Sequence, residues 1–234
     1  MDTHLRTISV KGSLDNGMRI LDVGCGNGRY LSEISTSCRI QAVGLDCSAA
    51  MLSIARQRNI PEVEWLLSAA ENATLESSSF NLAYSIYVEH QIGDLPAYFS
   101  QISRALKLDG IFILVTCTLD QIAAFLPYRL APGLLEIECR RFHGLDVIVE
   151  TAQTSGLNLY EMHKEDQPPG VMSPERLAAL IRLRFLSVLA GKDKKFLEML
   201  ADQVISHCRT HSYDLVSSFG HVTFCFRKSR RLCL

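Results

Sequence analysis

The stretch Ile20–Leu31, ILDVGCGNGRYL, decides the fold. Its apolar start, interrupted by the single acid Asp22, predicts a strand buried in a parallel sheet. Glycines at positions 24, 26 and 28 follow, and the run after them has helical character. Because glycine has no Cβ, the backbone of such a turn can approach a ligand closely. A strand that passes through a glycine turn into a helix builds a nucleotide cradle at the carboxyl end of a sheet.

The spacing separates this turn from the dinucleotide fingerprint G-x-G-x-x-G, because the third glycine comes one residue early. A phosphate site gains nothing from an acid two residues before the turn, whereas Asp22 suits a cationic ligand. S-adenosylmethionine carries a sulfonium, an ammonium and no phosphate. The run from Asp22 to Gly28 resembles the first motif of the class I S-adenosylmethionine-dependent methyltransferases, (D/E)-x-G-x-G-x-G, at every required position. An ordinary tight strand-to-helix turn is the alternative.

The resemblance implies an α/β fold with a doubly wound, seven-stranded, mostly parallel sheet. The strands are expected at residues 19–23, 40–45, 63–67, 81–88, 111–117, 157–162 and 221–227. We expect a single methyltransferase domain over 1–234, with a helical insertion at about 167–217 between the last two strands. Residues 1–18 leave room for one short helix, so this insertion is expected to cap the substrate.

The resemblance also implies a binding site for S-adenosylmethionine. Asp46, 22 residues after Gly24, stands where the family's acid accepts the ribose hydroxyls. Met51 is expected either near adenine or in the core. Ala69 replaces the family's adenine-binding acid, and the Ala70 backbone or the Glu71 side chain is expected to substitute. The expected cofactor-binding residues are Asp22, Gly24, Cys25, Gly26, Gly28, Asp46, Cys47, Met51, Ala70, Glu71, Ser85 and Ile86.

The run S-x-x-V-E-H, which ends in Glu89 and His90, resembles the family's fourth motif, whose residues face the substrate. Methyl transfer needs positioning, exclusion of water and sometimes removal of a proton. We expect His90 as the base, because imidazole titrates near neutral pH, or else as a structural histidine. Glu89 is expected to orient His90, to bind a cationic substrate, or merely to complement a helix N-terminus. Tyr87 is expected to face the cofactor or the core.

Three candidate substrate contacts lie in the second half of the chain. Tyr128 and His143 fall in residues 118–144, which predict a loop with short helical pieces. Ser173 predicts a helix N-cap with Pro174 behind it. Apolar residues then recur at helical spacing as far as Val188. Arg184 interrupts this stripe, so it is either solvated or pairs with an acidic acceptor.

Composition excludes several classes. The net charge is −1 and the pI about 6.6, unlike a typical nucleic-acid binder. No apolar run reaches the ~18 residues of a membrane span, and the start of the chain lacks the apolar core of a signal peptide. The eight cysteines show neither C-x-x-C nor zinc spacing. These features predict a reduced, cytoplasmic protein with no metal, and no obligate protein partner is evident.

Three functions remain open. The first is methyl transfer to a small-molecule acceptor, whose identity the sequence does not give. The second is methylation of tRNA, since tRNA-modifying members have a similar first motif. The third is a protein that binds the cofactor without methylating, such as a cyclase or a scaffold.

Overall fold

The computed structural model describes residues 3–166, 171–211, 216–217 and 220–229. The chain divides into two compact units. The first comprises residues 1–116, 143–163 and 223–234, and the second comprises 117–142 and 164–222.

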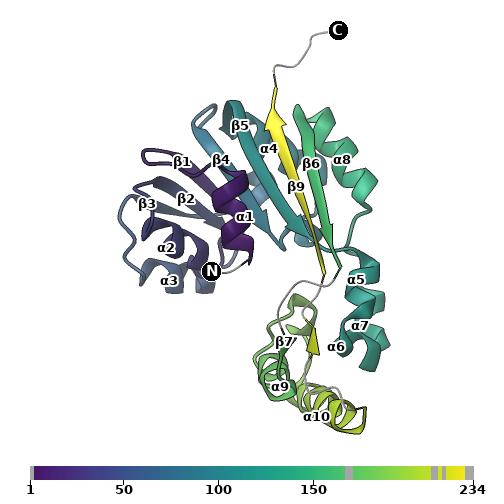
Figure 1. The fold of residues 1–234 in the computed structure, drawn as a ribbon. Helices are drawn as coiled ribbons and strands as arrows, with labels where there is room; N and C mark the ends of the chain where they lie inside the picture. The colour runs from purple at the N-terminus through teal and green to yellow at the C-terminus, as the bar shows by residue number, and fades with distance from the viewer. Residues whose placement is uncertain (1–2, 167–170, 212–215, 218–219, 230–234) are drawn as a thin grey trace. The chain divides into compact units, whose positions relative to one another are not determined.

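A seven-stranded sheet forms the centre of the first unit (Figure 1). Its order is β3-β2-β1-β4-β5-β9-β6, which confirms the predicted α/β class. The pairs β1–β2, β1–β4, β2–β3 and β4–β5 are parallel. In Figure 1, β9 runs opposite to β6 beside it. The strands are β1 Arg19–Val23, β2 Gln41–Asp46, β3 Val63–Leu67, β4 Phe80–Ile86, β5 Leu106–Thr116, β6 Leu157–Glu165 and β9 His221–Lys228.

The described part of this unit contains five helices and two short 3-10 turns. They are α1 Thr3–Lys11, α2 Arg29–Ser35, α3 Ala49–Arg56, α4 Leu95–Ala105, α8 Leu145–Thr154, η1 Ala70–Asn72 and η2 Glu89–Gln91. The apolar run of β1 is buried from Ile20 to Val23, as expected for a strand with neighbours on both sides. It packs in a core with Leu31 of α2 and Leu82 of β4. This packing fixes the end of β1, and therefore the start of the glycine turn.

Five of the seven strands differ from the sequence-based expectation at one or both ends, among them β4 and β5. β4 ends at Ile86, and Tyr87 directly after it has a φ of +56°, in the left-handed region that side chains other than glycine rarely adopt. β5 begins at Leu106 rather than Ile111, and its register with β4 shifts between Phe80 and Leu82. Asp109 has a φ of +63° within that strand.

The second unit is helical. Its elements are α5 Leu119–Ala124, α6 Leu126–Leu130, α7 Pro132–Glu138, β7 Val171–Met172, α9 Pro174–Arg182, η3 Ser187–Leu189, α10 Lys194–Thr210 and β8 Val216–Ser217. The expected helices of the insertion are present, and the Ser173 side chain caps α9 by accepting from the Arg176 amide. The segment 118–144, expected as a loop with short helical pieces, contains the short helices α5, α6 and α7. The Pro-Pro-Gly run at residues 168–170, which cannot continue a helix or a central strand, lies outside the described residues.

Candidate functional site

The three glycines of the turn after β1 all have positive φ values, of +75°, +54° and +72°, but their surroundings differ. A Cβ on Gly24 would lie 2.2 Å from Val88 Cγ2, and one on Gly28 would lie 2.5 Å from the Trp65 ring. A Cβ on Gly26 would meet no atom of the described residues within 4 Å. Packing therefore requires the outer two glycines, whereas the middle glycine faces open space at the carboxyl end of the sheet.

Asp46 ties this turn to the end of β2. Its Oδ2 accepts from the Gly26 amide at 2.8 Å, and its Oδ1 accepts from the Ser48 amide at 2.7 Å. Each carboxylate oxygen can accept a second hydrogen bond, and the side chain is only half-buried. The predicted acceptance of ribose hydroxyls stays a prediction that this geometry permits. Cys47 beside it is exposed.

Asp22 is buried in β1, and the Tyr84 hydroxyl donates to its Oδ2 at 2.9 Å. Burial raises the pKa of Asp22 to about 8; the Tyr84 bond opposes this shift and the charge of Asp46 adds to it. Burial, reinforced by the charges of Asp22 and Asp46, also raises the pKa of the Cys25 thiol far above its usual range. A buried carboxyl without a neighbouring cation stabilises a cationic ligand better than an anionic one.

Helix α3 carries the residues expected near adenine. The Ser48 side chain caps it by accepting from the Met51 amide at 3.3 Å. Leu52 and Ala55 are buried, but Met51 is 40% exposed and Ile54 is also exposed. Met51 therefore does not lie in the core, because only the side of this short helix that carries Leu52 and Ala55 is buried. A place for Met51 beside a ligand stays a prediction.

The segment after β3 brings Glu71 towards the segment after β4. Glu71 and Ala70 lie in η1 and are half-buried. Glu71 Oε1 accepts from the Gly93 amide at 3.4 Å. A contact of either residue with adenine, in place of the acid that Ala69 replaces, stays a prediction.

The end of β4 lies directly against the glycine turn, because Val88 packs on Gly24. Ser85 has no exposed surface, whereas Ile86 is half-buried and offers some to a ligand. Tyr87 packs edge-on against His4 of α1, with ring centroids 5.3 Å apart, and borders the core. Cofactor contacts of Ser85 and Ile86 stay predictions.

Glu89 is fully buried and pairs with a histidine 54 positions away in the sequence. Its Oε1 lies 2.9 Å from Nδ1 of His143, and its Oε2 accepts from the Thr116 hydroxyl at 2.7 Å. His143 keeps 30% of its side chain exposed, whereas His90 is only 9% exposed. The sequence suggested that Glu89 orients His90, but the histidine that the structure pairs with it is His143. No local pattern could have joined these residues, since the pair forms only after folding.

Two other predicted substrate contacts differ from expectation. Tyr128 lies in α6 rather than in a loop, is buried, and donates to Glu138 Oε1 at 2.8 Å. Arg184 lies beyond the end of α9 in a left-handed conformation, so it interrupts no helical stripe. It is exposed and donates to the Lys192 carbonyl at 3.2 Å. Roles of both residues in substrate binding stay predictions.

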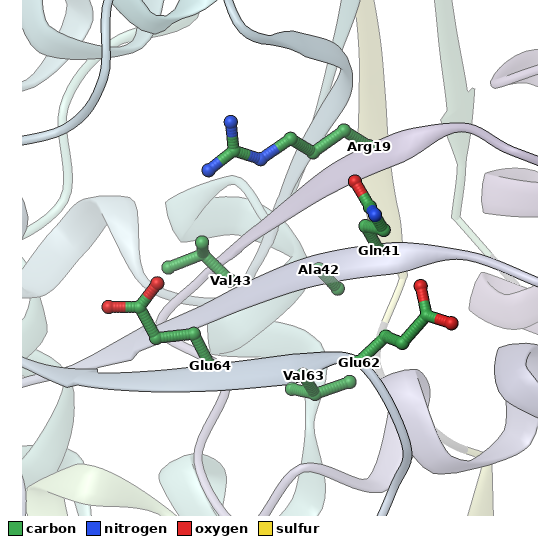
Figure 2. Close-up of a pocket in the computed structure, with 7 residues that line it drawn as sticks. All are labelled: Arg19, Gln41, Ala42, Val43, Glu62, Val63 and Glu64. Atoms are coloured by element: carbon green, nitrogen blue, oxygen red, sulfur yellow. The ribbon is translucent and has the colours of Figure 1, made fainter.

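A shallow pocket lies at the amino ends of three strands, opposite the end that carries the glycine turn (Figure 2). It surrounds the first residues of β1, β2 and β3, away from the glycine turn at their carboxyl ends. Its lining residues are Arg19, Gln41, Ala42, Val43, Glu62, Val63 and Glu64. Ligands of open α/β sheets bind at the carboxyl ends of the strands, so this pocket is not the candidate site.

Comparisons with known proteins agree with this geometry. A family model described as a methyltransferase domain matches residues 14–167. The chain belongs to the class I S-adenosylmethionine-dependent methyltransferases. The cofactor of this family is S-adenosylmethionine. Among the described residues, no helix is both long and apolar enough to cross a membrane.

The curated relatives of this methyltransferase are distant. It is 26% identical over 119 residues to the ubiquinone/menaquinone biosynthesis C-methyltransferase of Campylobacter jejuni, which covers 48% of the chain and 50% of that protein. It is 31% identical over 101 residues to the malonyl-acyl-carrier-protein O-methyltransferase of Legionella pneumophila, covering 42% of the chain and 36% of that protein. The chain thus spans half or less of the length of these two curated relatives.

Solved structures share the fold at low identity. The 4+2 cyclase SpnF matches with a TM-score of 0.66 and 19% identity, over 97% of the chain and 80% of that protein. Phosphoethanolamine N-methyltransferase 2 of Haemonchus contortus, solved with S-adenosylhomocysteine, matches with a TM-score of 0.62 and 21% identity. The match covers 97% of this chain and 52% of that protein. These likenesses show the fold alone.

Proposed function

We propose that this methyltransferase transfers the methyl group of S-adenosylmethionine to a small-molecule acceptor. The observation that carries the cofactor site is the open space beside Gly26, bordered by a turn that Asp46 holds through the Gly26 amide. A ligand can lie there against bare backbone, because no Cβ of the middle glycine intervenes.

The residues around this space fit the cofactor's chemistry. Asp22 offers a buried carboxyl to the cationic end, and Asp46 offers acceptors to the ribose hydroxyls. Met51 and Glu71 stand on the segments where adenine is expected. When bound, the cofactor supplies a methyl group activated by its sulfonium. The protein's part is to align the acceptor and exclude water.

The small-molecule acceptor is supported by charge and by the relatives. A net charge of −1 provides no strong field for a nucleic acid. The names of the two relatives give one carbon and one oxygen acceptor, in quinone biosynthesis and on a malonyl group. The atom methylated by this chain is therefore left to experiment.

The test combines mass spectrometry with a turnover assay. Small molecules that co-purify with the full chain are identified, then offered with S-adenosylmethionine while release of S-adenosylhomocysteine is measured. The proposal expects stoichiometric methylation of at least one of them. Turnover only with tRNA, with salt-dependent binding, would support the second function instead. Conversion of a ligand without S-adenosylhomocysteine release would support a cyclase.

A further inference from the structure

The Glu89–His143 pair lies beside the glycine turn that follows β1. Val88, the residue before Glu89, packs on Gly24. Thr116, which donates to Glu89, is the last residue of β5. The pair therefore stands at the carboxyl ends of β4 and β5, next to the turn that follows β1, within the first unit.

The pair fixes the ring of His143. Glu89 Oε1 lies 2.9 Å from Nδ1 and 3.4 Å from the backbone nitrogen of His143, so ring and main chain are held together. The Thr116 hydroxyl bond occupies the other carboxylate oxygen. A carboxylate only accepts hydrogen bonds, so in the neutral ring Nδ1 carries the proton and Nε2 presents a lone pair. Among the described residues, no hydrogen bond reaches Nε2, and 30% of the side chain is exposed.

We propose that His143, positioned by Glu89 and Thr116, is the general base of the transfer, and that the acceptor is a neutral hydroxyl compound. This rests on the proposed function above. The acceptor oxygen forms a bond to the methyl carbon while the methyl–sulfur bond breaks with its electron pair going to sulfur. The hydroxyl proton moves to His143 Nε2. The sulfonium becomes a neutral thioether, and the positive charge ends on the imidazolium beside the Glu89 carboxylate.

A buried carboxylate suits this charge movement. The hydrogen bond between His143 and Glu89 becomes stronger when the ring takes up the proton, because both partners are then charged. An acceptor that is already anionic, such as a carboxylate, has no proton to lose and would make no use of the pair. The pair therefore points to a hydroxyl acceptor rather than to a carboxylate acceptor.

The test measures methyl transfer from S-adenosylmethionine to three probes at mildly alkaline pH. Phenol is largely neutral there, 4-nitrophenol is ionised, and benzoate is a carboxylate. The variants are His143→Gln, Glu89→Gln and, as a matched control, His163→Gln, an exposed histidine on β6. We expect His143→Gln to lower kcat for phenol ~100-fold and to leave kcat for 4-nitrophenolate nearly unchanged. Glu89→Gln should lower kcat for phenol by a smaller factor, and His163→Gln should leave it unchanged. The affinity for S-adenosylmethionine should be the same in all three variants.

A second readout does not depend on turnover. NMR of the full chain with 15N-labelled histidine, saturated with S-adenosylhomocysteine, reports which ring nitrogen of His143 carries a proton. A proton on Nδ1 alone supports the proposal. A proton on Nε2, or a doubly protonated ring, overturns it even if no probe is methylated. Equal losses for phenol and 4-nitrophenolate, or turnover with benzoate alone, also overturn it while leaving the methyltransferase function intact.

Discussion

At the scale of single residues, Asp22 is an ionisable group buried inside β1, two residues before the glycine turn. A carboxyl inside a parallel strand loses its hydration, and one hydroxyl from Tyr84 restores only part of it. The raised pKa, about 8, is the result. Under the proposed function the cationic end of the cofactor takes the place of this proton in the complex, so proton and cofactor are expected to compete for the Asp22 carboxyl.

The stability of the protein should therefore depend on pH through Asp22. The pKa of the Asp22 carboxyl is about 8 in the folded chain, compared with an ordinary value of 3.8. The folded chain therefore binds this proton more tightly than the unfolded chain does. The protonated carboxyl makes its full contribution to the free energy of unfolding at pH values below 3.8. That contribution is lost as the pH rises through about 8. Thermal unfolding of the wild type should show this loss, whereas Asp22→Asn, which keeps an acceptor for Tyr84, should lose less stability over the same range.

Saturating S-adenosylmethionine provides the control for this pH dependence. A cation beside Asp22 favours the ionised carboxyl, so the wild type with cofactor should resemble Asp22→Asn in its pH slope. Identical slopes for the free wild type and the variant would show that Asp22 does not titrate in this range.

The sequence predicted some site residues and not others for a physical reason. Asp22, Gly26 and Asp46 belong to short patterns whose spacing reflects the geometry of one strand and its turn. Glu89 and His143 are 54 residues apart, and their 2.9 Å contact depends on where the chain returns to the sheet after α7. Periodicity and spacing carry no record of such a return.

At the scale of elements, the junction of the glycine turn with the end of β4 positions the candidate site. Val88 fills the space that a side chain at position 24 would take. Glu89 follows immediately in η2, so the fit of Val88 on Gly24 sets the distance between the cofactor turn and the Glu89–His143 pair.

Gly24→Ala should destabilise the fold through both a clash and backbone strain. The added Cβ would lie 2.2 Å from Val88 Cγ2 at a φ of +75°. Overpacking adds roughly 1–3 kcal/mol and the left-handed conformation roughly 1–2 kcal/mol to the loss. Val88→Ala in the same chain should recover the clash part and leave the strain. Chemical denaturation of the two single variants and the double variant measures this, and strictly additive losses would refute the contact.

The predictability of the elements followed the clarity of their sequence boundaries rather than their burial. The limits of β1 and β3 were predicted to the residue, because apolar runs between turn signals mark the strands. α9 was expected to continue to Val188 but ends at Arg182, where Arg184 takes a φ of +55°. The helical spacing of apolar residues continues past Arg182, and no glycine or proline marks the end of the helix. Leu186, Val188 and Leu189 are buried, but they lie in and beside the 3-10 turn η3 rather than in α9. Helical periodicity alone could not distinguish the two arrangements.

At the scale of the whole molecule, the second unit gathers two chain segments, 117–142 and 164–222. Within it, Arg182 of α9 pairs with Glu198 at 2.6 Å and Asp202 at 3.0 Å on α10. We retain the proposal that its later segment, 167–217, caps the substrate, since a dry site favours methyl transfer. Residues 167–170 and 212–215 of this cap lie outside the described residues.

Limited trypsin digestion tests this cap. Exposed basic residues of the segment include Arg184, Lys194 and Lys195, and Arg39 on the first unit serves as the internal control. Cofactor together with a methylated acceptor should slow cleavage at the first three sites and leave Arg39 unchanged. Equal cleavage with and without ligands, with activity surviving the cut, would rule out a cap.

The claim on which all of this depends is that the cofactor lies in the open space beside Gly26. Gly26 and Gly17 both have positive φ, +54° and +80°, and neither would place a Cβ within 4 Å of another described atom. Asparagine tolerates this conformation better than other side chains, so Gly26→Asn and Gly17→Asn should fold with similar small losses. Only the first would fill the cofactor space. Titration calorimetry with S-adenosylmethionine should show at least a ~10-fold weaker Kd for Gly26→Asn and an unchanged Kd for Gly17→Asn. Wild-type affinity in folded Gly26→Asn would contradict the account.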